Sequence, residues 1–471
     1  MKSILNIVAI SILIFASRKN QDEIYGQYTV PPSKTEVHAG YKQTKISWPR
    51  GSDQSVTSIP AGIITENPEY TSEIPGPSDK TPTEEELQEE LKDIDEQIPV
   101  LGWWGLSYDL RAGYKDMADA GFTIDFPVDS IYPSDPDKLF DMLDVAQDNG
   151  IKLQIFASVI DNFSTPNMNK LKAHPALWGY HILDEPSTAQ FDEQGARVRA
   201  VQAIDNIHPC YVNLFGTYAN STQLGAATYT DYVRDFIDKV PVTILSYDHY
   251  PIRTSDSTKS VRSDFYENLE IIAEKSRDAG IPFWAFALST AHGPYPTPTL
   301  NDLRLQVYSN LAYGAQCIQY FTYRQPDSIF SNAPVDYSGT KTATYNTVKE
   351  MNQEIKALSK VFLGSSVVWT AHSGISGIPS GCKQLDNSKL PPQIKTFAIT
   401  AGTGALVSLM KRGTDNFLII VNHDVNENTT VFVEGDSSLR RVEKDGKIVI
   451  ANKARLNTLT PGNALIYFWK N

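Results

Sequence analysis

The sequence predicts an α/β protein, a (β/α)8 TIM barrel followed by a C-terminal β-sandwich, and three observations carry that prediction. Eight short apolar runs alternate with helical segments through the middle of the 471-residue chain. Several helical segments stop at glycine, which helix C-termini favour. Towards the C-terminus the pattern changes to short strand-like runs separated by turn residues. Eight strand and helix units over about 260 residues are typical of a TIM barrel.

The first 18 residues are expected to form a secretory signal peptide. Lys2 precedes an apolar run at residues 4–15, and the small residues Ala16 and Ser17 close it. A short basic start, an apolar stretch and small residues at its end are typical of such signals. The run is shorter than the about 20 apolar residues that span a bilayer, and a buried first helix is the alternative. No later segment of the sequence reads as a membrane span.

Residues 19–95 are expected to be a leader or linker that contains a short acidic helix. Most of this stretch is rich in Ser, Thr, Pro and Gly and has no sustained apolar period, which is typical of linkers. Thr81 suits the N-cap, Pro82 suits the first helical position, and Glu84 completes a capping box. The helix should therefore begin near Pro82 and lead into the first barrel strand.

The barrel is expected to span residues 96–362. Its strand candidates are short apolar runs, many of them rich in β-branched and aromatic residues. They lie at residues 100–106, 123–128, 152–158, 177–184, 210–215, 242–247, 283–288 and 317–323. No Gly-x-Gly-x-x-Gly turn opens the first helix, which argues against a dinucleotide-binding fold. Residues 363–471 hold seven strand-like runs and are expected to form a β-sandwich packed on the barrel.

The composition restricts the partners. The formal net charge is -13, with 55 acidic against 42 basic residues, which argues against a nucleic-acid partner. Three cysteines are too few for a disulfide framework in a chain of this size. No Cys-x-x-Cys, paired histidine spacing or Asp-x-Asp-x-Asp-Gly loop indicates a metal. Neither a metal nor a cofactor is therefore expected, and the composition leaves the oligomeric state open.

Polar and aromatic residues follow the predicted strands, at the ends where TIM barrels carry their chemistry. Among them Glu185 is the strongest candidate, because it follows an apolar strand and Asp184 and precedes Pro186, which stiffens the turn. A partly buried carboxylic acid at this place could protonate a leaving-group oxygen. The alternative is that Asp184 and Glu185 cap the next helix or bind an arginine.

Residues 174–187 resemble the fourth strand of TIM-barrel glycoside hydrolases, in the broad retaining superfamily that includes cellulases and β-galactosidases. Residues 313–323 look like the eighth strand of the same enzymes. The resemblance covers residues 98–471 in outline, and its specific part is the strand end at Asp184 and Glu185. It implies a hydrolase of O-glycosyl bonds in which Glu185 is the general acid.

Two features depart from that superfamily. Asn commonly precedes the acid/base residue, where Asp184 stands here, and the nucleophile usually ends strand seven, where residues 286–290 hold no carboxylate. The best remaining partner is Asp248 at the end of strand six, expected as a base or charge stabiliser, and Asp125 and Asp161 are weaker candidates. The alternative is that Asp248 holds a substrate hydroxyl or a neighbouring histidine. Carboxyl groups about 5–5.5 Å apart would retain the anomeric configuration, and about 6.5–9.5 Å would invert it.

Further residues are expected to bind the sugar. Aromatic faces take up the C–H faces of sugar rings, and carboxylates and amides bind hydroxyl groups. The candidates are Trp103, Trp104, Asp125, Asp184, Asn213, Tyr250, His292 and Tyr323. Each aromatic ring has ordinary core packing as its alternative. His181 lies inside the fourth strand and is expected to face the core or the helices.

Three functions remain open at this point. The preferred one is a glycan hydrolase exported to the periplasm, cell surface or medium of a bacterium. The second is a non-catalytic carbohydrate-binding protein, which the missing carboxylate of strand seven favours. The third is an adhesion or scaffold protein with the leader as a tether, and it does not explain the polar rim. The sugar, its linkage and its anomeric configuration are not determined by the sequence.

Overall fold

The computed structural model describes residues 82–471, apart from 129–131, 376 and 452. The predicted signal peptide and nearly all of the predicted leader lie outside the described residues. The chain from Glu84 to Asn471 lies in one compact unit. None of the helices described there is long and apolar enough to cross a bilayer.

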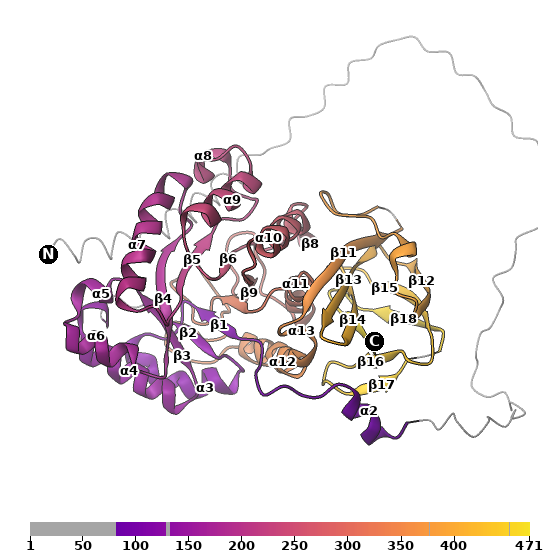
Figure 1. The fold of residues 1–471 in the computed structure, drawn as a ribbon, viewed down its shortest axis with the longest axis horizontal. Helices are drawn as coiled ribbons and strands as arrows, with labels where there is room; N and C mark the ends of the chain where they lie inside the picture. The colour runs from indigo at the N-terminus through magenta and orange to yellow at the C-terminus, as the bar shows by residue number, and fades with distance from the viewer. Residues whose placement is uncertain (1–81, 129–131, 376, 452) are drawn as a thin grey trace, which may run out of the picture. The chain divides into compact units, whose positions relative to one another are not determined.

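Eight parallel strands close into a barrel, which confirms the predicted fold class (Figure 1). Their order around the barrel is β1, β10, β9, β6, β5, β4, β3 and β2. The strands are β1 (Val100–Trp103), β2 (Ile124–Phe126), β3 (Lys152–Phe156), β4 (Leu177–Asp184), β5 (Cys210–Leu214), β6 (Leu245–Tyr247), β9 (Phe283–Leu288) and β10 (Ile318–Phe321). Because all eight run in the same direction, their C-terminal ends lie on one rim.

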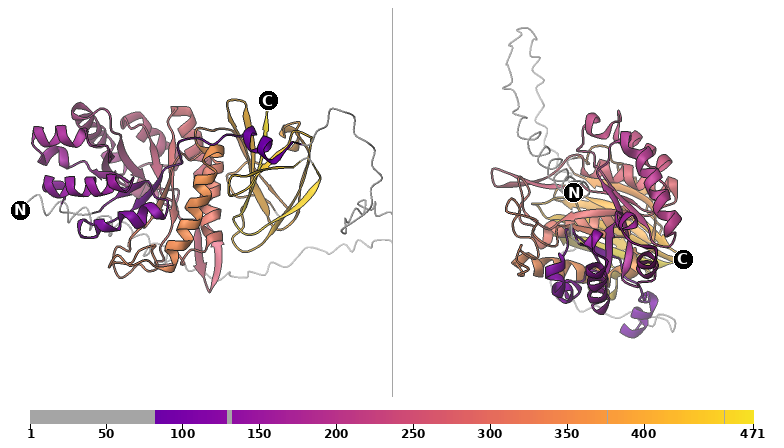
Figure 2. Two further views of the ribbon diagram at one scale, coloured as in Figure 1. Left: turned by 90° about the horizontal axis from the view of Figure 1, so that it is seen from below. Right: turned by 90° about the vertical axis from the view of Figure 1, so that its left-hand side faces the viewer.

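Helices connect the strands and surround them (Figure 2). The main ones are α3 (Tyr114–Asp119), α4 (Pro136–Asp148), α6 (Thr165–Lys172), α7 (Phe191–Ile204), α9 (Tyr229–Lys239), α10 (Phe265–Ala279), α11 (Leu300–Ala312) and α12 (Ala343–Ala357). Local signals begin and end them. Asp135 caps α4 by accepting a hydrogen bond from the backbone N–H of Lys138. Gly280 ends α10 with a φ of 67°, a left-handed conformation that glycine adopts without strain.

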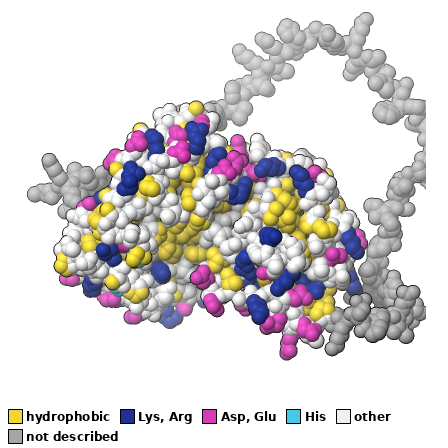
Figure 3. Space-filling model, in the orientation of Figure 1, with side chains coloured by type: hydrophobic (Ala, Val, Ile, Leu, Met, Phe, Trp, Pro, Cys, Tyr) yellow, Lys and Arg dark blue, Asp and Glu magenta, His cyan; other side chains and the backbone are white. Residues whose placement is uncertain are grey.

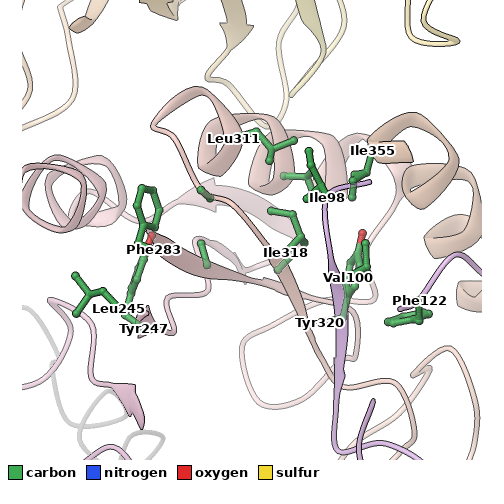
Figure 4. Close-up of a cluster of buried hydrophobic side chains, with 14 of the residues drawn as sticks. Ile98, Val100, Phe122, Leu245, Tyr247, Phe283, Leu311, Ile318, Tyr320 and Ile355 are labelled. Atoms are coloured by element: carbon green, nitrogen blue, oxygen red, sulfur yellow. The ribbon is translucent and has the colours of Figure 1, made fainter. Parts of the chain in front are cut away.

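Successive side chains of the strands alternate between the barrel interior and the helices. Inside, Trp103 is fully buried, and its ring centroid lies 4.8 Å from that of Phe126 and 5.3 Å from that of His181. The prediction that His181 faces the core is therefore confirmed. Outside, apolar side chains pack between strands and helices, as Figure 4 shows for Ile98, Val100, Leu311, Ile318, Tyr320 and Ile355. Two apolar faces explain why these strands read as continuous hydrophobic runs.

A β-hairpin that the sequence did not predict lies between β6 and α10. It pairs β7 (Ile252–Ser255) with β8 (Thr258–Val261) in an antiparallel ladder. Asp256 and Ser257 form the two-residue turn and have φ values of 49° and 65°. Two-residue turns of this kind normally carry Asn-Gly or Asp-Gly. The hairpin was missed because its turn has no glycine.

The C-terminal part forms two antiparallel sheets, which confirms the predicted β-sandwich. The larger sheet has the order β11 (Ser366–Gly374), β13 (Gly404–Arg412), β14 (Asp415–Asn422), β19 (Ala464–Lys470), β16 (Arg440–Val442) and β17 (Ile448–Ile450). The smaller has β12 (Ile394–Ala401), β15 (Thr429–Gly435) and β18 (Arg455–Leu459). Val407 and Leu418 of the larger sheet and Val431 of the smaller belong to one buried apolar cluster between them.

Contacts join the sandwich to the barrel helices. Leu406 and Phe417, on the other face of the larger sheet, belong to the same apolar core as the barrel helices. The hydroxyl of Ser408 donates to the carbonyl oxygen of Ala312 at the end of α11, at 2.7 Å. The edge of β17 is covered by the helix α2 (Glu84–Glu90), where the Gln88 side chain both donates to and accepts from the Ile448 backbone at 3.0 Å. Covering an exposed strand edge in this way prevents pairing with other chains.

Two imidazoles, the buried His372 and the half-buried His423, lie where the sandwich meets the barrel helices. Nδ1 of His372 lies 3.2 Å from Nδ1 of His423, and Nε2 of His372 lies 3.1 Å from the hydroxyl of Tyr313. Burial holds the pKa of His372 well below its usual value, and a charge on His423 would lower it further. Burial also lowers the pKa of His423 to about 4, despite the opposing effect of Asp424. Both rings are therefore neutral at pH 7 in the folded protein.

Acid should weaken the fold through this pair. In the unfolded chain each ring takes up a proton near pH 6.5, whereas in the folded protein it does so only at a lower pH. The stability of the folded protein is therefore unaffected by this pair above pH 6.5 and falls as the pH drops towards 4. Between pH 7 and pH 4.5 the free energy of unfolding should fall by about 2–3 kcal/mol less in His423→Gln than in the parent. Urea unfolding of both proteins at the two pH values measures this difference. Equal losses would show that the pair does not contribute to acid sensitivity.

Candidate active site

Glu185 directly follows β4 and has a backbone conformation that is unusual for its residue type. Its φ is 48°, and its N–H donates to the carbonyl oxygen of Asn213 on β5 at 2.8 Å. Trp104, which follows β1, has a φ of 54°. Such strained non-glycine residues cluster at functional sites, where the surrounding structure holds them in place. The strand end that the sequence marked is thus also a conformational outlier.

The carboxyl groups of Glu185 and Asp248 are bridged by one hydroxyl group. The hydroxyl oxygen of Tyr218, in the loop after β5, lies 2.5 Å from Oε1 of Glu185 and 3.1 Å from Oδ1 of Asp248. The two carboxyl oxygens are therefore less than about 6 Å apart, whatever the angle at the hydroxyl. The structure brings together the two residues that the sequence nominated as a catalytic pair.

Asn213 at the end of β5 links the second carboxylate to a third. Its Nδ2 lies 3.0 Å from Oδ1 of Asp184 and 3.2 Å from Oδ1 of Asp248. Its Oδ1 accepts from the hydroxyl of Ser246 at 3.0 Å, so the orientation of the amide is determined. Asn213 is completely buried, and its amide hydrogen bonds go to neighbouring side chains, so it orients the carboxylates. That Asn213 also binds substrate stays a prediction.

Burial differs among the three carboxyl groups. Asp248 is only 1% exposed, whereas Asp184 and Glu185 are partly exposed. Burial, followed by the charges of Asp248 and Glu185, raises the pKa of Tyr218 well above its usual value. The phenol therefore keeps its proton and remains a hydrogen-bond donor throughout the neutral range.

His249 next to Asp248 belongs to a separate ion-pair cluster. Its Nε2 lies 3.3 Å from Oδ1 of Asp264, and Arg262 donates to both oxygens of the same carboxylate at 3.0 and 2.8 Å. Burial alone would raise the pKa of Asp264, but the hydrogen bonds from His249 and Arg262 outweigh it and hold that pKa far below its usual range. Burial lowers the pKa of His249. The contact of His249 with Asp264 favours Asp248 as a partner of Tyr218 and Asn213.

Aromatic rings gather at the ends of β6, β9 and β10. Tyr250 stacks on Phe321, with ring centroids 5.6 Å apart, and meets Tyr295 at 6.0 Å. His292 lies 4.9 Å from Tyr295 and 4.8 Å from Phe330. The structure thus brings Tyr250 and His292, both predicted from the sequence, into one aromatic cluster on the rim. Tyr250 is 6% exposed and His292 is partly exposed.

Two predicted sugar platforms are wrong, because their rings are completely buried. Trp103 lies inside the barrel among Phe126, His181 and other rings. Tyr323 packs outside the strands against Phe122, with centroids 4.9 Å apart. Only Trp104, at 8% exposure, retains some contact with solvent among the aromatic candidates of β1 and β10. Alternation along a strand separates neighbours such as Trp103 and Trp104, and the sequence alone does not show which faces the opening.

Asp125 is also corrected, because its side chain is completely buried outside the barrel interior. It accepts hydrogen bonds from the backbone N–H of Leu106 at 3.2 Å and from the hydroxyl of Tyr114 at 3.0 Å. A Cβ atom on Gly105 would lie 1.5 Å from its Oδ1, so only glycine fits there. Asp125 thus anchors the loop after β1. The weaker candidate Asp161 is exposed and forms a two-pronged ion pair with Arg197 at 2.9 and 2.6 Å.

Tyr218 was missed by the sequence reasoning, which stopped at Asn213. A signal was present in Gly216, two residues before it. A Cβ atom there would lie 2.7 Å from the carbonyl oxygen of Asp248 and 2.9 Å from the Tyr218 ring. Glycine therefore permits the close approach of these two segments, but that requirement is visible only in the folded chain.

Hydroxyl side chains occupy the end of the seventh barrel strand, β9. The Ser289 hydroxyl donates to the carbonyl oxygen of Thr322 at 2.8 Å, and the Thr290 hydroxyl to that of Ser331 at 3.1 Å. Both residues are completely buried. They fasten the strand end to the loop after β10.

The described residues contain no cluster of metal ligands, and one cavity lies outside the barrel rim. Within residues 82–471, apart from 129–131, 376 and 452, no three His, Cys, Asp or Glu side chains are grouped to hold a metal ion. A cavity of about 750 Å³ lies in the sandwich, lined by Arg441, Asn457 and other residues of β16 to β19 and by Tyr308 of α11. Its polar side chains largely pair with one another, as Arg441 does with Glu443. On the face in Figure 3, the described basic and acidic side chains are interspersed.

Comparison with known proteins gives a class. Residues 215–358 match the family model of glycoside hydrolase family 42, described as "Beta-galactosidase". That segment contains Tyr218, Asp248 and the strands β6, β9 and β10. No curated protein matches the sequence. The predicted class, a glycoside hydrolase on a TIM barrel, is confirmed.

Solved structures with a similar fold include several other glycosidases. A glycoside hydrolase matches with 12% identity and a TM-score of 0.48, over 79% of this chain and 92% of that one. The α-L-arabinofuranosidase of Thermotoga maritima matches with 9% identity and a TM-score of 0.43, over 77% and 90%. The endo-1,4-β-mannanase of Eisenia fetida matches with 11% identity and a TM-score of 0.38, over 56% and 94%. At these scores the likeness carries no argument about substrate.

Replacing Asp125 should change the alkaline stability of the protein. Burial raises the pKa of Asp125 to about 8, against the lowering effect of its hydrogen bonds from Tyr114 and Leu106. A carboxyl group whose folded pKa is raised contributes stability at low pH and loses it as the pH rises towards that pKa. Between pH 5 and pH 9 the free energy of unfolding of the parent should therefore fall by about 2–4 kcal/mol more than that of Asp125→Asn. Urea unfolding at the two pH values measures this.

The same variant tests the correction at this position. Because Asp125 faces the loop after β1, Asp125→Asn should retain glycan hydrolysis at pH 6. A folded Asp125→Asn protein that neither binds nor cleaves a glycan that the parent cleaves would restore Asp125 to the substrate site.

Proposed function

We propose that the protein hydrolyses glycosidic bonds of an oligo- or polysaccharide with retention of configuration, with Glu185 as acid/base and Asp248 as nucleophile. The observation that carries the proposal is the hydroxyl of Tyr218, which lies 2.5 Å from one carboxyl group and 3.1 Å from the other. Retaining enzymes keep their carboxyl groups about 5–5.5 Å apart. Inverting enzymes need about 6.5–9.5 Å, because a water molecule must fit between the groups.

The two environments support different roles for the two carboxyl groups. Asp248 accepts hydrogen bonds from Tyr218 and Asn213, and donors of this kind favour a charged acceptor. Glu185 lies close to that charge and to Asp184, and like charges at this distance resist a second ionisation. On these contacts we assign the role of general acid to Glu185 and the role of nucleophile to Asp248.

Hydrolysis then proceeds in two displacements. Glu185 gives its proton to the glycosidic oxygen while a carboxylate oxygen of Asp248 bonds to the anomeric carbon, and the leaving group departs as an alcohol. In the second step Glu185 takes a proton from water, and the water oxygen displaces Asp248 from the anomeric carbon. The second displacement regenerates both groups, and the two inversions together restore the starting configuration.

The residues of the rim support a carbohydrate as the substrate, and the N-terminal sequence supports action outside the cytoplasm. Asp184, Trp104, Tyr250 and His292 end or follow barrel strands on the same rim and offer carboxylate, aromatic and imidazole groups that bind sugar hydroxyls and ring faces. The family model described as "Beta-galactosidase" supports β-galactosides as the first substrates to examine. The basic and apolar start of the chain supports export from the cytoplasm of a bacterium.

Removing either carboxyl group should abolish hydrolysis. We expect Glu185→Gln and Asp248→Asn each to lower kcat/KM by about a hundredfold or more, because each acts on the reacting atoms. Initial rates on a panel of aryl β-galactosides and β-linked polysaccharides measure this. Ser289→Ala, altered at the end of β9, is the matched control and should remain active. If the parent binds one of the glycans without cleaving any, the barrel is a binding protein.

The stereochemical outcome tests the carboxyl separation. Proton NMR of an aryl β-glycoside during hydrolysis should show the β-anomer of the sugar first, followed by slow mutarotation. An initial α-anomer would mean an inverting enzyme, and Asp248 would then be a base acting through water.

A further inference from the structure

Tyr218 is placed to do more than hold two side chains. Its hydroxyl oxygen lies between the two carboxyl groups, at 2.5 Å from Glu185 and 3.1 Å from Asp248. A phenol can accept one hydrogen bond and donate another at the same time. When the pair carries one proton, Glu185 can donate to the oxygen of Tyr218 while Tyr218 donates to Asp248. In that protonation state both hydrogen bonds exist together, and the one donated by Tyr218 goes to a charged acceptor.

We propose that Tyr218 is a positioning residue that stabilises the singly protonated carboxyl pair and reverses its hydrogen bond during the reaction. This inference rests on the proposed function, because it takes Glu185 as the acid and Asp248 as the nucleophile. With both groups protonated, Tyr218 would donate to a neutral acceptor, which is the weaker hydrogen bond. With both ionised, its single hydrogen could serve only one of them. Tyr218 therefore widens the pH range in which the pair holds one proton.

The hydroxyl can follow the negative charge through both steps. In the first, Glu185 loses its proton to the glycosidic oxygen, and the charge of Asp248 disappears as its oxygen bonds to the anomeric carbon. The hydrogen of Tyr218 then turns from Asp248 to Glu185, which is now the charged group. In the second step Glu185 takes a proton from water, the bond from Asp248 to the anomeric carbon breaks, and the hydrogen turns back. Tyr218 keeps its own proton throughout.

Arg262 and His249, which both contact Asp264, lie against the ring of Tyr218. The guanidinium of Arg262 lies over its ring at 5.8 Å, and the His249 ring lies at 6.0 Å. Both are tied to the carboxylate of Asp264. The raised pKa of Tyr218 supports its role as a permanent donor. Asp184 is linked to the same pair through Asn213. Rotation about the phenolic C–O bond can turn the hydroxyl hydrogen from one carboxyl group to the other without moving the ring.

The test compares Tyr218→Phe with Tyr232→Phe. Tyr232 is also buried, and its hydroxyl donates to the carbonyl oxygen of Pro186 at 2.7 Å, so the control removes a hydroxyl from the same strand end without touching either carboxyl group. We expect Tyr218→Phe to lower kcat/KM by about 10- to 100-fold. The pH range over which kcat/KM of Tyr218→Phe stays high should shrink at its acid and alkaline ends, by about one pH unit in total. Tyr232→Phe should keep the pH range of the parent. An unchanged width in Tyr218→Phe would overturn the proposal.

A second measurement separates this proposal from the proposed function. Carbon-13 NMR of the side-chain carboxyl carbons, assigned with Glu185→Gln and Asp248→Asn, follows the titration of the pair without substrate. In the parent the two carboxyl groups should titrate in two steps that are well separated in pH. In Tyr218→Phe the pH difference between the two steps should be smaller. This result would support the role of Tyr218 even if the parent cleaved no glycan. Identical titrations in the two proteins would overturn it even if the parent were active.

Discussion

Closure of the eight parallel strands is the constraint on which the rest of this protein depends. Closure places the C-terminal ends of β4, β5 and β6 side by side on one rim. Glu185, Asn213 and Asp248 follow or end these three strands, so residues far apart in the chain come within hydrogen-bond reach of shared partners. The sealed interior supports that rim from below, with Trp103 and His181 packed edge to face beneath it. A strand register shifted by one residue would turn these carboxyl groups outward.

The chemistry of the rim arises from unequal surroundings of similar groups. Asp184, Glu185 and Asp248 are all carboxyl groups, yet they differ in burial and in the donors that reach them. Such differences give neighbouring carboxyl groups separate protonation states and separate roles. A phenol with a raised pKa is suited to link them, because it donates without competing for their proton. At the end of the seventh strand hydroxyl groups fasten the backbone, and Asp248 lies directly after β6.

Several rim residues show which site positions can be predicted from the sequence pattern and which cannot. Glu185 and Asp248 were identified because polar residues after apolar runs mark strand ends in a barrel. Trp103, Tyr323 and Asp125 were identified by the same rule and proved to be buried, since residues adjacent in sequence alternate between opposite faces. Tyr218 lies on a loop that no periodic pattern describes. Its place is set by the close approach of Gly216 to Asp248, which is a property of two segments and not of one.

The sequence by itself determined the barrel, the sandwich and the strand end at Glu185, because hydrophobic periodicity and helix-ending glycines are local features that survive without tertiary context. It could not determine the hairpin of β7 and β8, whose turn at Asp256 and Ser257 has positive φ values without glycine. Only the tertiary structure decided that Glu185 and Asp248 share one hydroxyl and that Asn213 is buried behind them. The physical reason is that distances between strand ends depend on register and closure, which involve the whole barrel at once.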